Sequence, residues 1–388
     1  MSPPPAPGSL PTARQRRNRV LGPVVVLVAL GICGLTVLGL VAGSIGTSGV
    51  LVGAVCALLP VGPVVAAFLW VDRWEPEPPR LLLFAFGWGA CVAALTALLV
   101  NTSAISLLEQ TLGQDTGALA GPALVGPFVE EAVKGAFLVG LLVLHGREFD
   151  GVVDGVVYAG IVAAGFAFTE NILYFGQAFV TDGFGGATGG VLVTFLLRGV
   201  FAPFAHPLYT AMIGIGAGLA AGSRNPGFRI GAVVVGYLVA VLLHAVWNGA
   251  ATLFGGTAFF DVYSYVMVPV FLALIGLVFW QRRREQATLA EHLPEFARQG
   301  WVAPSEVRLM ASMAGRREWR RKVGARSGRA AAKAVADYQA AVTELAFLQA
   351  RIARGTAGAD ADQWRRQALT DVYQARRRAV GRADEAAR

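Results

Sequence analysis

The chain has 388 residues, of which 55% are hydrophobic and only 15% are charged, and its formal net charge is +8. Its mean hydropathy is +0.56, and the apolar residues come in long blocks instead of alternating with polar ones. A soluble domain rarely reaches this apolar fraction. The composition therefore excludes a soluble globular protein and predicts a multi-pass membrane protein.

The chain begins with a leader, residues 1–19, which is rich in proline and arginine and which we predict to be disordered and cytoplasmic. Apolar runs of at least about 18 residues follow, the length that a helix needs to cross a bilayer. These eight runs lie near 20–43, 49–70, 81–100, 117–144, 152–179, 190–221, 229–254 and 262–281. The sequence therefore predicts an all-α fold, a polytopic bundle of about eight transmembrane helices over residues 20–281.

Lysine and arginine are confined to alternate loops between these runs. One set of loops reads ARQRRNR, DRWEPEPPR, HGREFDG, GSRNPGFR and QRRR. The other set, GSIGTS, NTSAISLLEQTLGQDTG, TDGFGGATG and GGTAFFD, contains neither residue. Because basic loops stay on the cytoplasmic side, we predict that both termini are cytoplasmic and that the protein spans the plasma membrane.

The last segment, residues 282–388, is rich in alanine, arginine and glutamate, with apolar residues at helical spacing. We predict a basic helical cytoplasmic tail made of several amphipathic helices. Two interpretations stay open: a solvated helical appendage, or a segment that contacts anionic lipids or a cytoplasmic partner. No recognition motif indicates a nucleic-acid partner.

A few ionisable side chains lie inside the apolar runs, where charge costs several kcal/mol. They are Glu130, Glu131 and Lys134 in the fourth run, Glu170 in the fifth, Arg198 and His206 in the sixth and His244 in the seventh. With a rise of about 1.5 Å per residue, most of these groups fall within one or two helical turns of the same depth. We expect Arg198 to pair or to snorkel, and the other groups to converge on one site.

The local spacing indicates which of these groups share a helix face. Lys134 lies four residues after Glu130 and three after Glu131, so it can pair with either carboxylate. His244 and Asn248 are also four residues apart and face the same way.

Together these motifs resemble a known family. EEAVK at 130–134, FAFTEN at 166–171 and HAVWN at 244–248 are similar to the EExxK, FxxxEN and closing histidine motifs of the PrsW-type intramembrane proteases. DRWEPEPP at 72–79 and HPLYTAMIG at 206–214 are similar to further blocks of that family, and the resemblance spans roughly 65–255. The closing motif ends in Asp or Asn in the family, and here it ends in Asn248.

The resemblance implies an enzyme that hydrolyses peptide bonds within or at the edge of the membrane, related to the CAAX prenyl endopeptidase and bacteriocin-processing group. It also implies the partners, which would be single-pass membrane proteins such as anti-sigma-factor-like regulators.

Amide hydrolysis needs an activated water, stabilisation of the oxyanion and a proton for the leaving nitrogen. Our hypothesis gives Glu130 or Glu131 the role of general base, and His206 the role of holding the water or passing on the proton. His244 and Asn248 would donate to the oxyanion. Lys134, Glu170 and Asn171 would support these groups.

A metal-dependent mechanism is an open alternative. His206, His244 and Glu131 would form the two-histidine, one-glutamate set of catalytic zinc sites, although no HExxH helix is present. Two other classes of function also stay open. A proton- or ion-coupled transporter would use the same Glu/His/Lys cluster, and a non-catalytic scaffold would act through the basic tail.

Overall fold

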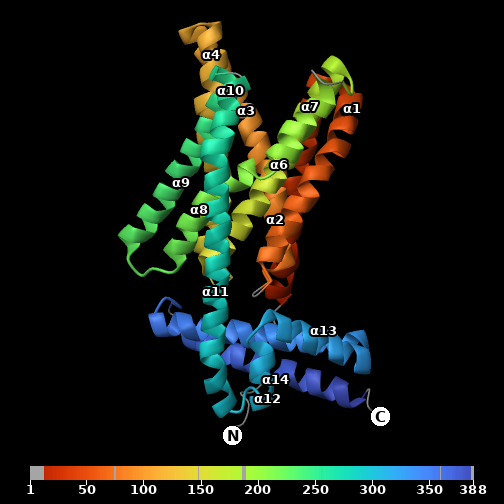
Figure 1. Cartoon of the computed structure of the whole chain (residues 1–388), viewed down its shortest axis with the longest axis vertical. Coiled ribbons are helices and arrows are strands. Elements are labelled where there is room, and N and C mark those ends of the chain that lie inside the picture. Colours follow the sequence, from red (N-terminus) through yellow and green to blue (C-terminus); the bar gives the residue numbers. More distant parts are fainter. Residues whose placement is uncertain are drawn as a thin grey trace.

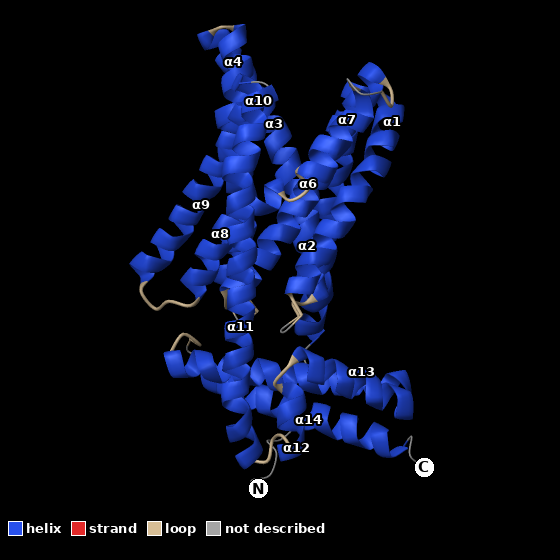
Figure 2. Ribbon diagram, viewed as in Figure 1, coloured by secondary structure: helices blue, strands red, loops and turns tan. Residues whose placement is uncertain are grey.

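The structure, a computed structural model, describes residues 13–73, 76–146, 148–185, 189–254, 256–358 and 360–385. Every regular element in these ranges is helical, as Figure 2 shows. The all-α prediction is therefore confirmed for the described residues. The first twelve residues of the predicted leader lie outside them.

Figure 1 shows a set of long, roughly aligned helices above a layer of helices that cross them. The α-helices are, in chain order, α1 (Ala13–Val71), α2 (Pro79–Gly87), α3 (Ala94–Leu112), α4 (Gln114–Ala120), α5 (Gly126–Leu144), α6 (Val152–Asp182), α7 (Gly190–Phe195), α8 (Ala205–Ala221), α9 (Pro226–Gly249), α10 (Gly256–Val262), α11 (Val268–Arg298), α12 (Pro304–Met310), α13 (Met313–Arg354) and α14 (Ala361–Glu385). Short π-helical segments join several of them: η1 (Trp88–Ala93), η2 (Gly121–Val125), η3 (Leu196–Phe201), η4 (Ala250–Phe254) and η5 (Tyr263–Met267).

Six helical segments of the described chain are long and apolar enough to cross a membrane. They are Val24–Val71, Pro79–Leu112, Val152–Asp182, Gly190–Ala221, Pro226–Thr252 and Phe259–Arg298. The prediction of a multi-pass helical bundle is confirmed to this extent. The predicted number of eight is not, because the first two predicted runs belong to one helix, α1, and because α5 in the fourth run carries three charged side chains.

Helix α1 differs from the prediction at both ends of its first run. It begins at Ala13, so residues 13–19 are helical although they belong to the predicted disordered leader. Their alanine, arginine and glutamine residues favour helix, which lets the apolar helix extend toward the N-terminus. At Gly46 the backbone takes φ 72° and ψ 166°, values open to glycine and outside the helical region. Two helical segments of α1 therefore meet at a kink at this residue.

Helices α1 to α11 form what we call the membrane part of the molecule. Helix α6 lies at its centre, packed against α1 on one side and α8 on another. Glycine makes these approaches possible. A Cβ atom on Gly155 would lie 2.0 Å from the carbonyl oxygen of Gly214 on α8, and one on Gly53 of α1 would lie 2.2 Å from the carbonyl oxygen of Ile172 on α6. Backbones that pack this closely gain dispersion energy where lipid supplies no hydrophobic drive. Helix α6 is therefore a fixed scaffold for the polar residues that it carries.

The C-terminal helices have a hydrophobic core of their own. Leu289, Leu293, Met310, Val342 and Leu345 are fully buried in it. Helix α11 joins this core to the membrane part, since it runs without a break from Val268 to Arg298. The predicted boundary at 281/282 therefore falls inside a helix, because the charged residues after Trp280 are good helix formers and continue it into water.

Candidate functional site

Helices α5, α6, α8 and α9 bring together the polar side chains that the sequence singled out. Helix α5 carries Glu130, Glu131 and Lys134, α6 carries Glu170 and Asn171, α8 carries His206, and α9 carries His244 and Asn248. Four separate segments of the chain thus meet at one level of the bundle. The expected convergence is present in the structure.

Breaks in the helices lie next to these side chains. Pro127 stands in the first turn of α5, directly after the π-helical η2. The chain between η3 and α8, residues 202–204, is not helical, and His206 is the second residue of α8. Asn248 lies at the end of α9, just before η4. Irregular backbone at membrane depth is tolerated where it lines a cavity, and π-helical turns are common at functional sites.

Lys134 lies at the centre of the cluster and is completely buried. Its Nζ atom lies 2.8 Å from Oε1 of Glu131, 3.5 Å from Oε2 of Glu130 and 3.2 Å from Nδ1 of His206. It also lies 3.9 Å from the centre of the Phe166 ring. An ammonium group has three hydrogens to donate and no lone pair. Lys134 is within hydrogen-bond distance of Glu131 and His206 and forms a longer ion pair with Glu130, and His206 must accept through Nδ1.

Glu131 is completely buried and fully occupied. Its Oε2 accepts a hydrogen bond of 2.8 Å from the Thr210 hydroxyl, and its Oε1 lies 3.0 Å from Nδ1 of His244. Because Oε1 also accepts from Lys134, the carboxylate is ionised and His244 donates its Nδ1 hydrogen. This leaves the Nε2 lone pair of His244 free on the opposite side of the ring.

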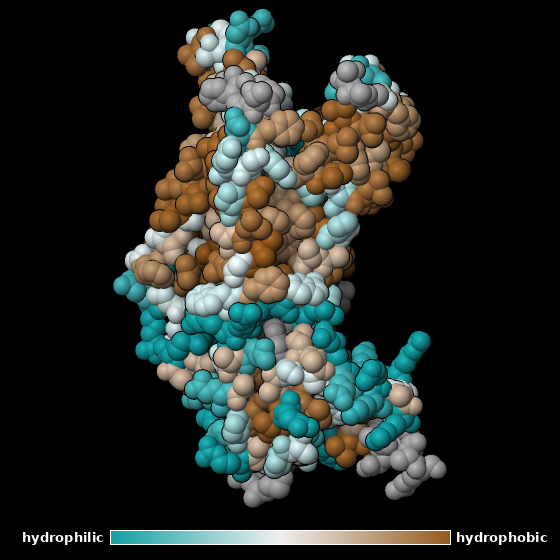
Figure 3. Space-filling model, in the orientation of Figure 1, coloured by the Kyte–Doolittle hydropathy of each residue, from teal (hydrophilic) through white to brown (hydrophobic). Residues whose placement is uncertain are grey.

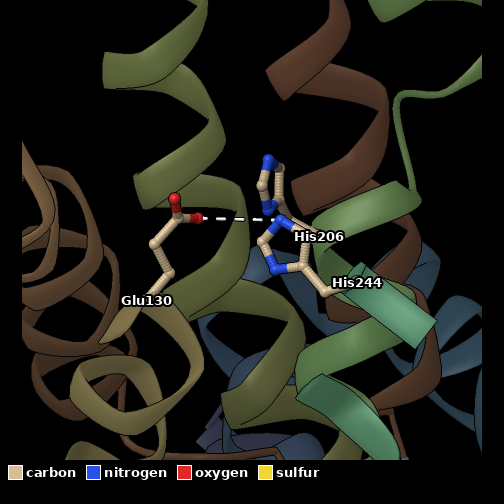
Figure 4. A group of neighbouring side chains, drawn as sticks. All are labelled: Glu130, His206 and His244. Carbon is tan, nitrogen blue, oxygen red and sulfur yellow. Dashed lines mark ion pairs between the residues drawn. The ribbon is translucent and has the colours of Figure 1, made fainter. Parts of the chain in front are cut away.

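Glu130 is held differently from its neighbour. Its Oε1 accepts a 3.3 Å hydrogen bond from the Asn101 amide, whereas its Oε2 is buried and has no hydrogen-bond donor among the described residues. That oxygen lies 3.8 Å from Nε2 of His244, the pair joined by the dashed line in Figure 4. Two acceptor atoms thus face each other with the His206 ring beside them. Such a gap attracts a proton donor or a cation.

His206 is linked to a second ion pair. Its Nε2 lies 2.8 Å from Oε2 of Glu170, and since Nδ1 is the acceptor, Nε2 must carry the hydrogen. Glu170 also pairs with Arg198, whose Nε donates a 2.8 Å hydrogen bond to Oδ1 of Asn171. Arg198 therefore pairs, as expected, and it fixes Glu170 and Asn171. The fixed Glu170 in turn orients His206.

The cluster forms the floor of a cavity of about 580 Å³. Glu130, Glu170, His206 and Asn248 line the cavity, whereas Glu131, Lys134 and His244 do not. Its other walls come from α1, α3, η3 and η4. In Figure 3 the surface is hollowed between the arm that ends at α4 and the arm that ends at α7, away from the C-terminal helices.

Asn248 lies on this cavity wall but already has one partner. Its Nδ2 donates a 2.9 Å hydrogen bond to the carbonyl oxygen of Pro122 in η2. That bond ties the end of α9 to the segment that precedes α5. An amide carries a second hydrogen on the same nitrogen, and this hydrogen is available to a ligand in the cavity.

The donor set fits a metal ion. Ligand atoms of Glu130, His206 and His244 all lie within 4.8 Å of one another, and Glu130 Oε2 lies 3.8 Å from His244 Nε2. Among the described residues, the group that could hold a metal contains Glu130, where the sequence hypothesis had Glu131, and Glu131 contacts Nδ1 of His244. Carboxylate, histidine and metal are often arranged in this order. His206 would complete the set by releasing Lys134 or Glu170.

The formal charge of the cluster supports the same conclusion. Its three carboxylates, Glu130, Glu131 and Glu170, face two permanent cations, Lys134 and Arg198. With neutral histidines one negative charge remains in a region of low dielectric constant, where unpaired charge is costly. A proton or a bound cation would neutralise it.

Sequence reasoning missed two members of this network. Thr210 lies four residues after His206 and therefore on the same face of α8, a spacing that indicates its role. Asn101 fell in a predicted outer loop, yet α3 extends to Leu112 and places it beside Glu130. The polar residues after Val100 concealed the continuation of that helix.

Comparisons with known proteins agree with this geometry. The model of the family described as PrsW family intramembrane metalloprotease matches residues 77–274, just over half of the chain. Protease PrsW of Clostridioides difficile (strain 630) is 26% identical over 195 residues, which cover 49% of this chain and 76% of that protein.

Two further proteins named protease PrsW match shorter stretches. The protein of Geobacillus kaustophilus (strain HTA426) is 37% identical over 121 residues, 29% of this chain and 49% of its own length. The protein of Oceanobacillus iheyensis (strain DSM 14371) is 31% identical over 112 residues, 29% of this chain and 46% of its own length. No solved structure matches the chain.

Proposed function

The chain belongs to the PrsW family of intramembrane metalloproteases, and from this premise we propose that it hydrolyses peptide bonds of membrane-anchored proteins in the cavity above Glu130. The single observation that carries the proposal is the buried Oε2 atom of Glu130. It lines the cavity, has no hydrogen-bond donor among the described residues and faces the lone pair of His244.

The contacts of the two glutamates support different roles for them. Glu131 is saturated by Lys134, Thr210 and His244 and has no access to the cavity, so it acts as the group that orients His244. Glu130 has a free oxygen on the cavity side and acts as the general base. A base must reach the proton that it removes, which of these two glutamates Glu130 does.

In the proposed reaction, a water molecule donates a hydrogen bond to Glu130 Oε2 and attacks the scissile carbonyl carbon. Glu130 takes up the proton of the water as the new C–O bond forms. Asn248 donates its second amide hydrogen to the oxyanion. Glu130 then returns the proton to the amide nitrogen as the C–N bond breaks, which leaves a carboxylate-bearing and an amine-bearing fragment.

The remaining groups hold this arrangement in place. Lys134 keeps Glu131 ionised, Arg198 keeps Glu170 ionised, and the two carboxylates fix the rings of His244 and His206. In the metal-dependent alternative Glu130 would be a ligand instead of the base. A zinc ion held by Glu130, His206 and His244 would then lower the pKa of a bound water and polarise the scissile carbonyl.

We further propose that the chain spans the plasma membrane eight times. Helix α1 is about 90 Å long at 1.5 Å per residue, three times the thickness of the hydrocarbon layer, and its turn at Gly46 makes two spans of it. Helix α5 is the other additional span, with its charges turned toward the protein interior. The basic loops then place both termini, and the C-terminal helices, in the cytoplasm.

The proposed substrates are single-pass membrane proteins, including regulators that resemble anti-sigma factors. The cavity supports this because it lies between helical arms whose outer surfaces are apolar, so that a substrate helix would reach it from the lipid.

The test uses the purified full-length protein in nanodiscs with a panel of fluorescently labelled single-pass substrates. Wild type is compared with Glu130→Gln, Glu131→Gln and His244→Ala. We expect Glu130→Gln to lower the rate by about 10²–10⁴-fold, the usual value of general base catalysis, without a change in unfolding temperature. Glu131→Gln should also lower the rate, but with a clear loss of stability, because it removes a buried partner of Lys134.

Each arm of this test separates the alternatives. Chelation that abolishes cleavage, with recovery on addition of zinc, assigns the metal to the cluster. Cleavage that persists in Glu130→Gln contradicts the assignment of the base. A proton flux in proteoliposomes that requires Glu130, without cleavage, would favour the transporter. A function that survives Glu130→Gln and His244→Ala but is lost on deletion of 282–388 would favour the scaffold.

A further inference from the structure

One cationic side chain lines the cavity of the candidate site. Arg198 belongs to the π-helical segment η3, and it is the single lysine or arginine among the described residues that line the cavity. Its side chain is 26% exposed. Most of the other lining side chains are apolar. Arg198 is therefore the strongest hydrogen-bond donor that an occupant of this cavity would meet.

Two hydrogen bonds and one stacked ring hold the guanidinium of Arg198 in place. Its Nε donates a 2.8 Å hydrogen bond to Oδ1 of Asn171, and its Nη2 donates to Oε2 of Glu170. The ring of Tyr174, about one helical turn further along α6, has its centre 3.8 Å from the guanidinium carbon. Because all three partners come from α6, the guanidinium is fixed relative to that helix.

Three N–H groups of Arg198 remain for a ligand. A guanidinium has five N–H donors, and the two hydrogen bonds use one on Nε and one on Nη2. The other three have no acceptor among the described residues. The charge of Arg198 is already balanced by Glu170, and the carboxylates of the site outnumber its cations. A further carboxylate is therefore unfavourable here, and a neutral acceptor such as a carbonyl oxygen is favoured.

The guanidinium lies beside the groups that we assign to the reaction. Oε2 of Glu170 accepts from Nη2 of Arg198 and lies 2.8 Å from Nε2 of His206, so both side chains bind the same oxygen atom. His206 and Glu130 line the same cavity as Arg198. A substrate that places its scissile bond at Glu130 therefore brings its neighbouring peptide groups toward Arg198.

The proposed substrate supplies carbonyl oxygens that need a donor. A single chain that crosses lipid is helical, because its backbone carbonyls must be hydrogen-bonded within the chain. To present one peptide bond to a general base, the helix must unwind locally, and the unwinding frees the carbonyl oxygens on either side of that bond. An unpaired carbonyl is costly away from water. The site must therefore offer N–H donors to the unwound segment.

We propose that Arg198 binds backbone carbonyl oxygens of the unwound substrate segment next to the scissile bond. The inference rests on the proposed proteolysis and identifies a substrate-binding residue of that same site. Asn171, Glu170 and Tyr174 hold the plane of the guanidinium before the substrate arrives. Because the bonds go to main-chain atoms, the enzyme favours transmembrane segments that unwind at low cost over segments with a particular side chain.

The test is a double-mutant cycle between Arg198 and the backbone of a synthetic single-pass substrate. The full-length protein in nanodiscs cleaves the all-amide peptide, and mass spectrometry of the fragments locates the scissile bond. A series of peptides then replaces one flanking amide at a time by an ester, whose carbonyl oxygen is a weaker acceptor. For wild type we expect kcat/KM to fall about tenfold at the position that Arg198 binds, as for the loss of one hydrogen bond to a charged group.

Arg198→Lys is the protein variant of the cycle. Lysine keeps the ion pair with Glu170 but lacks the planar set of five donors. We expect KM for the all-amide peptide to rise about tenfold with kcat within about threefold of wild type, because the lost contact is made before the chemical step. The sensitive ester should lower kcat/KM of this variant by less than about twofold, since the donor for its carbonyl is gone.

Arg229→Lys makes the same change at an exposed arginine of α9 and is the matched control. It should keep the KM and the ester sensitivity of wild type. If Arg198→Lys does not fold, Tyr174→Leu removes the stacked ring and leaves the partners of both hydrogen bonds in place. This variant should reduce the effect of the sensitive ester to about threefold.

Three outcomes would overturn the inference. Additive losses in the cycle, or a fall in kcat without a rise in KM, would mean that Arg198 acts only through Glu170. Coupling of Arg198→Lys to an acidic side chain of the substrate, in place of the ester, would assign the free N–H groups to a carboxylate. Absence of cleavage of the all-amide peptide by wild type would overturn the proposed function itself, and the inference with it.

Discussion

The membrane part and the C-terminal helices are built in opposite ways. In the membrane part, large apolar side chains such as Val143 and Leu144 are 71% and 76% exposed, while Glu131 and Lys134 are completely buried. In the C-terminal helices Leu289 and Leu345 are completely buried and charged residues cover the surface. Figure 3 shows the change from an apolar to a hydrophilic surface.

The difference shows that the surrounding solvent decides which residues hold a bundle together. In water, burial of apolar area stabilises a fold by about 25 cal/mol per Å². In lipid that term vanishes between helices, and close glycine contacts and buried polar links take its place. The same polar links then become available for chemistry.

The variant with the largest expected effect on stability removes Lys134, the central cation of the membrane part. Lys134→Met should destabilise the protein by about 3–5 kcal/mol, because Glu131 is left as a buried charge without its partner. Thermal unfolding in detergent measures the loss. Lys322→Ala, which breaks the exposed pair with Glu318, is the matched control and should leave the unfolding temperature unchanged. Equal shifts in both variants would contradict the comparison.

The next test removes apolar contacts from the C-terminal core. Leu345→Ala should cost about 3 kcal/mol, the usual penalty for a cavity at a fully buried leucine. Limited proteolysis should then cut α13 and α14 while the membrane part stays intact. Val380→Ala removes apolar groups from a half-exposed position and should change little. Simultaneous loss of both parts would mean that they fold as one unit.

A third test addresses the contact between the two parts. Arg351 on α13 is buried, with Nη1 3.0 Å from Oδ2 of Asp150 and Nη2 2.7 Å from the carbonyl oxygen of Gly146. Arg351→Ala should lower the free energy of unfolding by about 2 kcal/mol, the usual contribution of a hydrogen bond to a charged group. Hydrogen exchange of the loop that begins at His145 should rise.

The pH dependence of the Arg351→Ala variant tests the same contact. Burial raises the pKa of Asp150, and Arg351 opposes the rise. Without Arg351 the carboxyl group of Asp150 takes up a proton at higher pH than in wild type. The loss of stability caused by Arg351→Ala should therefore be smaller at pH 6 than at pH 8. Arg351→Lys keeps the charge but not the two-pronged contact and should recover part of the loss. A loss that is independent of pH would exclude Asp150 as the partner.

The smallest expected effect comes from an acid at the edge of the membrane part. Burial raises the pKa of Asp72 to about 7, and its Oδ2 accepts a 2.9 Å hydrogen bond from the backbone N–H of Glu77. The folded state therefore binds a proton that the unfolded state has released above pH 4. Stability falls as the pH rises, by about 1.4 kcal/mol between pH 6 and pH 8.

Asp72→Asn should remove this pH dependence, because the amide oxygen still accepts the hydrogen bond while no proton is exchanged. The measurement is the unfolding temperature in detergent at pH 6 and pH 8. The variant should be more stable than wild type at pH 8 and nearly equal to it at pH 6. A slope like that of wild type would mean that another group titrates.

The sequence by itself indicated that the chain lies in a membrane, that its fold is helical and which ionisable residues would converge, although not Thr210 or Asn101. Long apolar runs select helices because lipid offers the backbone no hydrogen-bond partners. Glu130, Glu131, Lys134, His206 and His244 stand out since buried charge is too costly to be kept without a partner. Helical spacing also indicated that Lys134 could pair with either glutamate, and in the structure it pairs with both.

Only the tertiary structure decided how these residues divide their roles. Adjacent glutamates look alike in sequence, yet Thr210 and His244 from other helices enclose Glu131 and leave one oxygen of Glu130 without a donor. Asn101 joins the site because α3 continues past the apolar run. Contacts between helices depend on rotation and depth, which each helix acquires from its neighbours and which no local pattern specifies.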